Sequence, residues 1–286
     1  MMSRGNTYTL VEADEFDRSF LHLRPTIACI TSMDLDHLDV YSDAASLQAA
    51  YVEFASQVKE ALFVEKNIAL NGITYSVSEE ADFYIDAIKP DASGSYFDLH
   101  TPDGVYKNQF FNQLGMHNLS NALVALAMAS KAGLQLQDLV KSLATFPGVQ
   151  RRLQVLINND NRVLIDDYAH HPTEIKAVYE TLKLSFPTEE KCVVFQPHLF
   201  SRTQDFMKDF ARVLSLFDRV LLLDVYAARE LPIAGVSSAA LKEMISGPSV
   251  ELITKKELAN RLSLVEERII VLLGAGDIGV EVEAIK

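Results

Sequence analysis

Apolar and polar positions along the first half of the chain alternate in a mixed strand and helix pattern. β-Branched and apolar residues predict strands over Thr7–Glu12 and Thr26–Thr31. Apolar residues then recur at helical spacing over Asp43–Glu60, with Asp43 near the start as a capping residue. An amphipathic helix is expected there.

Two turn signals follow this helix. The pair Asn71-Gly72 lies within one apolar stretch and the triplet Pro102-Asp103-Gly104 within another, so both stretches are predicted to form β-hairpins. The alanine- and leucine-rich residues Asn118–Ala132 predict a helix that ends before Gly133.

Strands and helices alternate strictly after the Pro-Gly pair at residues 147–148. Four apolar runs are predicted to be strands: RVLID, CVVFQ, RVLLLD and IIVLLG. Helices are predicted to begin near Thr173, Thr203 and Ser238. This alternation is typical of a parallel, doubly wound sheet, and we expect a domain boundary near residue 148.

Length and composition agree with about two globular domains, since 49% of the 286 residues are hydrophobic and 23% are charged. The formal net charge of −13 argues against broad attraction to nucleic acid or to an anionic membrane. No apolar run approaches the ~20 residues that span a bilayer, and the first residues do not have the pattern of a signal peptide. An anionic ligand would therefore need a local group of cations, and the candidates are Arg151, Arg152, Arg202 and Arg229.

Both cysteines, Cys29 and Cys192, lie inside apolar runs. Buried free thiols of a cytoplasmic protein are the expected interpretation, and a disulfide or a metal-binding pair is the lesser alternative.

Polar clusters follow three of the predicted strands in the second half. They span residues 166–171, 196–202 and 224–230. Because ligands bind beyond the carboxyl ends of the strands in such sheets, the three clusters are expected to meet at one edge.

The first of these clusters has the sequence DDYAHHPTE. Its adjacent histidines, His170 and His171, would face opposite ways on a strand and lack a metal-binding spacing. A pocket wall fits better: Asp167 could accept hydrogen bonds from ribose hydroxyls, Tyr168 could flank a base, and His170 could bind a polar substrate. Pro172 suits the first turn of a helix, which explains the end of the motif structurally.

Acidic residues gather at 12–17 and 34–39 in the first half. Glu12 suits Mg²⁺, which prefers oxygen ligands, whereas His37 would be an unusual partner for that ion. The alternative, favoured by spacing alone, is that these acids are solvated loop residues and helix caps.

Two further patterns allow both a structural and a functional interpretation. Asn118, near His117 and Asn121, is by default a helix cap, although its carboxamide could instead pair with the edge of adenine. Gly274–Gly279 matches G-x-G-x-x-G after a strand, but the acid expected about 20 residues later is absent before Lys286, so a tight turn is the better interpretation.

Seven motifs together resemble those of the Mur ligase family, in the same order and with similar spacing over essentially the whole chain. They are VEADEFDRSFLHLRP, DLDHLDVY, HNLSNA, FPGVQRR, DDYAHHPTE, FQPHLFSRT and DVYAARE. The resemblance implies an α/β protein in which residues 1–148 form a truncated central ATPase-type domain. Residues 149–286 are then a Rossmann-like, doubly wound C-terminal domain.

The resemblance also implies an activity. The family joins an amino acid to a nucleotide-linked acid with ATP, and the motifs are most similar to the branch that joins L-alanine to UDP-N-acetylmuramate. ATP first phosphorylates the substrate carboxylate, and the amine attacks the acyl phosphate. ATP and Mg²⁺ are the implied cofactors, both substrates are small molecules, and an oligomer is compatible with the pattern.

Site residues follow from the motif matches. Glu12 and His37 match magnesium-coordinating positions. The positions that match nucleotide contacts are His117, Asn118, Asn121, Arg152, Asp167 and Tyr168. Those that face the reacting carboxylate, phosphate and amino acid are His170, His198 and Arg202.

The sequence departs from the family pattern in two ways. Leu199 stands where the family commonly has arginine after Pro-His, so either Arg202 suffices or Arg229 substitutes. The G-x-x-G-K-[ST] phosphate loop and the preceding UDP-binding domain are missing from the sequence. We therefore expect a fragment with weak or undetectable ATP binding and no ligase turnover alone.

Alternative functions remain open from the sequence. One is the paralogous murein tripeptide ligase. The DDYAHHPTE and SFLHLRP motifs favour the alanine-adding branch over it. Another is a non-catalytic nucleotide-binding module, and a metal-dependent hydrolase is a distant third.

Overall fold

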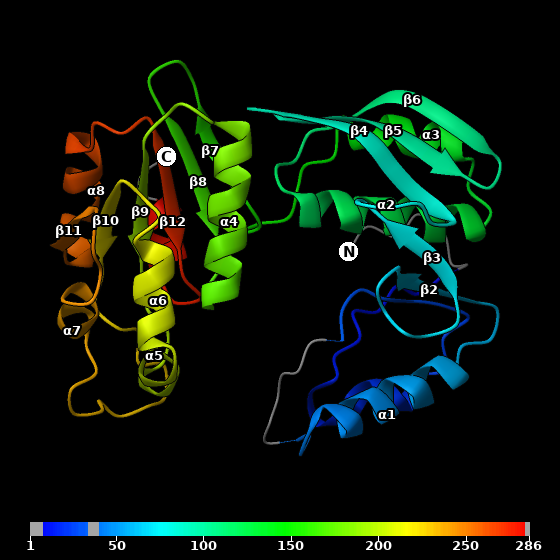
Figure 1. The fold of residues 1–286 in the computed structure, drawn as a ribbon, viewed down its shortest axis with the longest axis horizontal. Helices are drawn as coiled ribbons and strands as arrows, with labels where there is room; N and C mark the ends of the chain where they lie inside the picture. The colour runs from blue at the N-terminus through cyan, green and yellow to red at the C-terminus, as the bar shows by residue number, and fades with distance from the viewer. Residues whose placement is uncertain (1–7, 34–39, 284–286) are drawn as a thin grey trace. The chain divides into compact units, whose positions relative to one another are not determined.

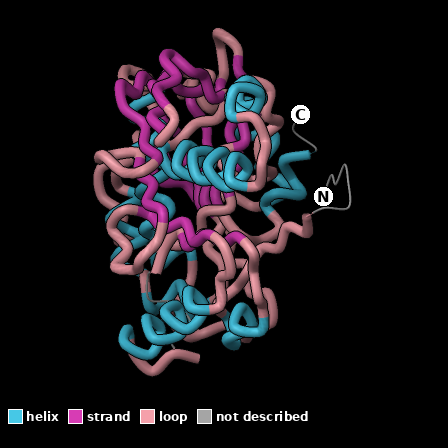
Figure 2. Tube along the Cα trace, turned by 90° about the vertical axis from the view of Figure 1, so that its right-hand side faces the viewer, coloured by secondary structure: helices cyan, strands magenta, loops and turns pink. Residues whose placement is uncertain are grey.

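The structure is a computed structural model that describes residues 8–33 and 40–283. Helices, strands and loops alternate along the whole described trace, as expected for a mixed α/β protein (Figures 1 and 2). The chain divides into two compact units. The first holds the described residues through Ile88, together with Phe97–Gln109 and Ser120–Leu143, and the second holds Lys89–Tyr96, Phe110–Leu119 and the residues from Ala144 onward.

A six-stranded sheet orders its strands as they follow in sequence, from β1 to β6. These strands are β1 (Ile27–Ile30), β2 (Ala61–Glu65), β3 (Ile73–Ser76), β4 (Phe83–Asp91), β5 (Gly94–Thr101) and β6 (Gly104–Phe111). The pairs β1–β2, β2–β3 and β3–β4 are parallel. The predicted strand at Thr26–Thr31 is confirmed as β1.

Helices cover part of this sheet. They are η1 (Phe16–His22), α1 (Ala44–Ser56), α2 (Met116–Lys131) and α3 (Leu136–Leu143). Asp43 caps α1 by accepting from the Ser46 amide at 2.7 Å, and Leu47 and Phe54 of α1 pack into a core with β1 and β2. Both predicted helices of this half are confirmed, although α1 ends earlier, at Ser56, and α2 begins earlier, at Met116.

Two predictions in this half are wrong. Residues Tyr8–Glu12 form no strand, because strand propensity has no effect without a neighbouring strand and these residues pair with none that the structure describes; Thr7 lies outside the described residues. Asn71-Gly72 is not a hairpin turn, since β2 and β3 run parallel and the residues between them carry the chain back. The Gly72 backbone passes close to β2, where a Cβ would lie 2.7 Å from the Leu62 carbonyl oxygen.

The second predicted hairpin is confirmed. Strands β5 and β6 are neighbours joined by a two-residue turn at Pro102-Asp103, a connection that only antiparallel strands allow.

The second unit contains another six-stranded sheet, in the order β11-β10-β9-β12-β8-β7. Its strands are β7 (Gln154–Asn158), β8 (Val163–Asp167), β9 (Lys191–Phe195), β10 (Arg219–Leu222), β11 (Ser249–Leu252) and β12 (Ile269–Leu273). All neighbours are parallel except β7, which runs antiparallel to β8 at the edge. The four predicted strands are confirmed as β8, β9, β10 and β12, while β7 and β11 were not predicted.

Helices lie on both faces of the second sheet. They are α4 (Pro172–Ser185), α5 (Phe200–Asp205), α6 (Met207–Leu214), α7 (Ser238–Lys242), α8 (Lys255–Leu264) and α9 (Ile278–Glu283). Figure 1 shows α4 and α6 beside this sheet, and Ile175 of α4, Phe210 of α6 and Leu241 of α7 share one core. Leu258 of α8 and Ile278 of α9 belong to the core on the other face. The sheet is therefore doubly wound, which explains why its central strands are continuous apolar runs.

Both cysteines are free thiols, as predicted. Cys192 is fully buried and Cys29 partly so, and burial raises the pKa of these thiols to about 12 and about 11. In residues 8–33 and 40–283 no helix has the length and apolar character needed to cross a membrane.

Candidate active site

The loops after β8, β9 and β10 meet at one edge of the second sheet, as their polar clusters predicted. His198 and Tyr226 form a parallel backbone bridge between the second and third loops. The His198 ring lies 6.0 Å from the His170 ring and 5.6 Å from the Tyr226 ring, centroid to centroid. This edge therefore gathers aromatic and titratable side chains from three separate segments.

His170 is held in one orientation by its own loop. Its Nδ1 lies 2.9 Å from the Tyr168 carbonyl oxygen, and its backbone amide donates to Glu174 at 2.8 Å. A carbonyl oxygen can only accept, so in the neutral ring Nδ1 carries the proton and Nε2 is the nitrogen that can accept one.

His171 is oriented differently and caps helix α4. Its Nδ1 accepts from the Thr173 amide, while Glu174 completes a capping box and Pro172 begins the helix. The His171 ring packs against Phe206 with centroids 4.6 Å apart, so the two neighbouring histidines serve different surroundings. The predicted helix start at Pro172 is confirmed, and the pocket wall stays a prediction.

The side chains of His198 and Arg202 lie next to each other. Arg202 Nη1 lies 3.5 Å from His198 Nδ1, and the guanidinium can only donate, which leaves the proton of neutral His198 on Nε2. No carboxylate among the described residues pairs with Arg202. A half-buried guanidinium of this kind is suited to a planar anion such as a carboxylate.

The pKa of His198 is lowered by burial, and the Arg202 and His170 charges act in the same direction, whereas Glu230 raises it. We expect the NMR titration midpoint of His198 to lie below the ordinary histidine value of about 6.5. Because the folded pKa lies below the unfolded one, His198 contributes stability above about pH 6.5, which is lost as pH falls through the folded pKa. Arg202→Ala should move the midpoint upward, and an unchanged midpoint would contradict the pairing.

Two buried carboxylates end strand β8. Asp167 accepts from the Leu153 amide at 2.7 Å and from the Ala169 amide at 2.8 Å, so both of its oxygens stabilise the local backbone. Burial raises the pKa of Asp167, although these two amides oppose the shift. Asp166 lies 3.5 Å from Arg151 Nε. A contact between Asp167 and ribose stays a prediction.

Arg151 is occupied by the protein itself. Its guanidinium donates to the carbonyls of Gly274 and Gly276 and lies 5.0 Å from the centre of the Tyr168 ring. The glycine motif therefore forms a loop between β12 and the short helix α9, filled by Arg151, in agreement with the predicted turn. Tyr168 is 38% exposed, which leaves part of it accessible.

The predicted adenine-contacting residues begin helix α2. Asn118 is the third residue of α2 rather than its cap, since the helix begins at Met116, and its Nδ2 donates to the Leu114 carbonyl at 2.8 Å. His117 and Asn121 are exposed, as is Arg152. Desolvation nevertheless lowers the pKa of His117, with Asp167 opposing the shift and Arg152 adding to it. His117, Arg152 and Asp167 are thus neighbours in the second unit.

The two predicted magnesium ligands belong to the first half of the chain. Glu12 is exposed on an irregular segment, and His37 lies outside the described residues. Across the described ranges no group of three or more His, Cys, Asp or Glu side chains could hold a metal ion. The assignment of Glu12 and His37 to Mg²⁺ therefore stays a prediction.

The segment at Leu199 has an unusual backbone. Leu199 has φ +69°, a region that non-glycine residues rarely adopt. Its amide donates to the Tyr226 carbonyl and its own carbonyl accepts from Thr203. Arg229, the suggested substitute for the family arginine, is exposed on the loop after β10.

Three residues at this edge were not predicted as functional: Ser201, Tyr226 and Glu230. Glu230 accepts from the Ser201 amide at 3.0 Å and from the Ser201 hydroxyl at 2.5 Å. The sequence signal for Glu230 is the DVYAARE motif, which follows a buried strand and ends in this acid.

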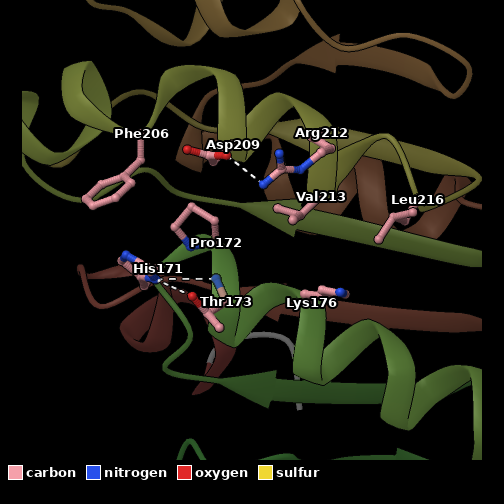
Figure 3. Close-up of a pocket in the computed structure, with 9 residues that line it drawn as sticks. All are labelled: His171, Pro172, Thr173, Lys176, Phe206, Asp209, Arg212, Val213 and Leu216. Carbon is pink, nitrogen blue, oxygen red and sulfur yellow. Dashed lines mark hydrogen bonds and ion pairs between the residues drawn. The ribbon is translucent and has the colours of Figure 1, made fainter. Parts of the chain in front are cut away.

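A separate pocket of about 580 Å³ lies between α4 and α6 (Figure 3). Lys176 lines the α4 side, and Asp209 pairs with Arg212 on the α6 side at 2.6 Å. None of the predicted site residues lines this pocket, although His171 and Phe206 form one end of it.

Comparison with protein families assigns both halves of the chain. The family model described as "Mur ligase middle domain" matches residues 1–129, and "Mur ligase, glutamate ligase domain" matches residues 151–276. The chain belongs to the Mur ligase family. The resemblance inferred from the seven motifs is therefore confirmed.

A Mur ligase relative with high similarity is the UDP-N-acetylmuramate–L-alanine ligase of Christiangramia forsetii, 49% identical over 288 residues. The alignment covers 100% of this chain and 64% of that protein, so the chain spans slightly less than two thirds of the relative's length.

Solved Mur ligase structures share the fold. UDP-N-acetylmuramate-alanine ligase from Thermotoga maritima matches with a TM-score of 0.77 and 24% identity, over 94% of this chain and 60% of that one. The MurF ligase from the same organism, solved in complex with ADP, matches with a TM-score of 0.70 and 15% identity, over 94% and 63%.

Proposed function

We propose that this Mur ligase chain is part of an ATP-dependent enzyme that joins L-alanine to UDP-N-acetylmuramate. The observation that carries the proposal is the 49% identity, along the entire chain, to a protein of that name. The group formed by His170, His198 and Arg202 supports it, because an acid–amine ligation requires bound anions and a proton acceptor.

In the proposed reaction an oxygen of the substrate carboxylate attacks the γ-phosphorus of ATP, and ADP leaves. The amine nitrogen of L-alanine then attacks the acyl carbon, and the tetrahedral intermediate expels inorganic phosphate. The amine loses a proton in this step. His170 Nε2 is suited to receive it, because Nδ1 is already committed to the Tyr168 carbonyl.

The guanidinium of Arg202 is proposed to bind carboxylate or phosphate oxygens beside His198. Its partly buried position strengthens such a contact relative to an exposed arginine. In this proposal Arg202 supplies the positive charge that the family arginine at the position of Leu199 would provide, and Arg229 is not required.

Nucleotide binding is proposed for the other group of predicted residues. Exposed Asn121 has a free carboxamide edge suited to adenine, whereas the Asn118 amide already donates to the backbone. Arg152 and Tyr168 are proposed to lie along the nucleotide, and ADP in the MurF structure supports this class of ligand. Mg²⁺ at Glu12 and His37 rests on the family resemblance alone. A cytoplasmic location follows from the ATP and nucleotide-sugar substrates.

The test is a ligase assay on the complete gene product that carries this sequence. We expect ADP formation that requires both UDP-N-acetylmuramate and L-alanine, at least tenfold faster than with the murein tripeptide in place of L-alanine. A preference for the tripeptide would assign the chain to the recycling branch, and ATP binding without turnover would support a non-catalytic module.

A further inference from the structure

Glu230 caps helix α5 by binding Ser201, which lies 29 residues earlier in the chain. Its carboxylate accepts from the amide and the hydroxyl of Ser201, at 3.0 and 2.5 Å. Ser201 is the second residue of α5, and the N-cap residue of that helix, Leu199, makes no side-chain cap. A distant acid therefore satisfies donors that helix starts usually satisfy with their own cap residue.

The same loop also holds the segment that precedes α5. The Tyr226 amide donates to the Pro197 carbonyl at 2.8 Å, and the Leu199 amide donates to the Tyr226 carbonyl at 2.9 Å. The Tyr226 ring stacks on His198 at an interplanar angle of 17°. Backbone and ring contacts thus fix His198 from the β10 loop.

The conformation of Leu199 requires such support. A non-glycine residue with φ +69° costs roughly 1–3 kcal/mol and persists only where its surroundings impose it. Leu199 lies between His198 and α5. The β10 loop therefore holds the chain on both sides of this strained residue, through Tyr226 at His198 and through Glu230 at Ser201.

Helix α5 carries Arg202 and has only six residues, too few to be stable without external contacts. At its far end Phe206 packs against the His171 ring. The position of the Arg202 guanidinium, 3.5 Å from His198 Nδ1, therefore depends on what holds the two ends of α5.

We propose that Glu230 is a positioning residue, which fixes α5 through Ser201 so that Arg202 and His198 bind the amino-acid substrate in a productive orientation. This inference rests on the proposed function. It assigns the contribution of the DVYAARE motif to its acid and to Tyr226, rather than to Arg229.

The test compares Glu230→Ala with a matched control, Glu257→Ala. Glu257 accepts from the amide and hydroxyl of Thr254 at 2.8 and 2.7 Å, the same type of cap at the start of α8. In the complete gene product, Glu230→Ala should raise the KM for L-alanine at least tenfold and leave the KM values for ATP and UDP-N-acetylmuramate within twofold. Glu257→Ala should leave all three within twofold.

A second variant, Ser201→Ala, removes only the hydroxyl donor and should raise the KM for L-alanine about threefold. It keeps the test decisive if Glu230→Ala does not fold. An unchanged KM for L-alanine in a folded variant would overturn the inference, and so would an equal rise in all three KM values.

Failure of the proposed function is recognised separately, because it appears as absent alanine-dependent turnover in the unmodified protein. In that case NMR on the 286-residue chain tests whether Glu230 positions α5 and His198. Glu230→Ala should accelerate hydrogen exchange of the Ser201 amide at least tenfold and shift the His198 ring signals, whereas Glu257→Ala should change neither. Unchanged exchange and ring signals would refute positioning.

Discussion

Arg202→Ala is expected to lower kcat/KM for L-alanine by about 30- to several-thousand-fold in the complete gene product. Truncating one partner of a charged, partly desolvated hydrogen bond costs about 2–5 kcal/mol, and each 1.4 kcal/mol is a factor of ten. The structure supports a large effect because Arg202 lies beside His198 and pairs with no carboxylate in the described ranges.

Arg202→Lys separates charge from geometry. Lysine keeps the positive charge but loses the planar fork that binds a carboxylate through two donors, so we expect a loss of roughly tenfold. Arg212→Ala on the adjacent helix is the matched control, since Arg212 is exposed and pairs with Asp209. A loss of activity as large with Arg212→Ala as with Arg202→Ala would contradict a specific role for Arg202.

Asp167→Ala is expected to destabilise the second unit by about 2–6 kcal/mol. The change leaves the buried amides of Leu153 and Ala169 without their acceptor, and each unsatisfied buried donor costs about 1–3 kcal/mol. Hydrogen exchange of peptides covering β8, β9 and α4, measured at increasing urea, reports this unit directly. Asp209→Ala is the control, because an exposed ion pair contributes only about 0–1 kcal/mol.

Asp167→Asn tests the charge of the same group. Burial raises the pKa of Asp167, so the folded chain binds this proton more tightly than the unfolded chain does. The contribution of Asp167 to the free energy of unfolding therefore falls as pH rises from about 3.9 through the folded pKa. The asparagine variant should lack this component, and an identical pH dependence in both proteins would show that the carboxylate is not perturbed.

The central strands of the second sheet could be predicted because their signal is local. Strands β8, β9 and β12 are buried on both faces, so each is a run of apolar residues that is visible without knowledge of its neighbours. Alternation with helices then implied parallel strands, and parallel strands place their following loops at one edge. This is why the meeting of His170 and His198 was predictable.

Strands and turns that depend on pairing were predicted less well. Tyr8–Glu12 has β-branched and apolar residues but no strand partner, and Asn71-Gly72 has hairpin chemistry but precedes a parallel strand. The edge strand β7 also escaped prediction, because none of its residues is fully buried and its pattern is weaker than that of a buried run. In each case the deciding interaction lies with residues elsewhere in the chain.

Residue types and their order established the α/β class, the doubly wound second sheet and the Mur ligase motifs, because these depend on hydrophobic periodicity and local spacing. The three-dimensional arrangement established which polar atoms are already occupied. Asp167 stabilises the Leu153 and Ala169 amides, Arg151 fills the glycine loop, and Glu230 reaches Ser201. Apart from the local Asp167–Ala169 contact, these interactions join residues 14 or more positions apart in the chain, so they depend on how strands and helices pack rather than on the preferences of neighbouring residues.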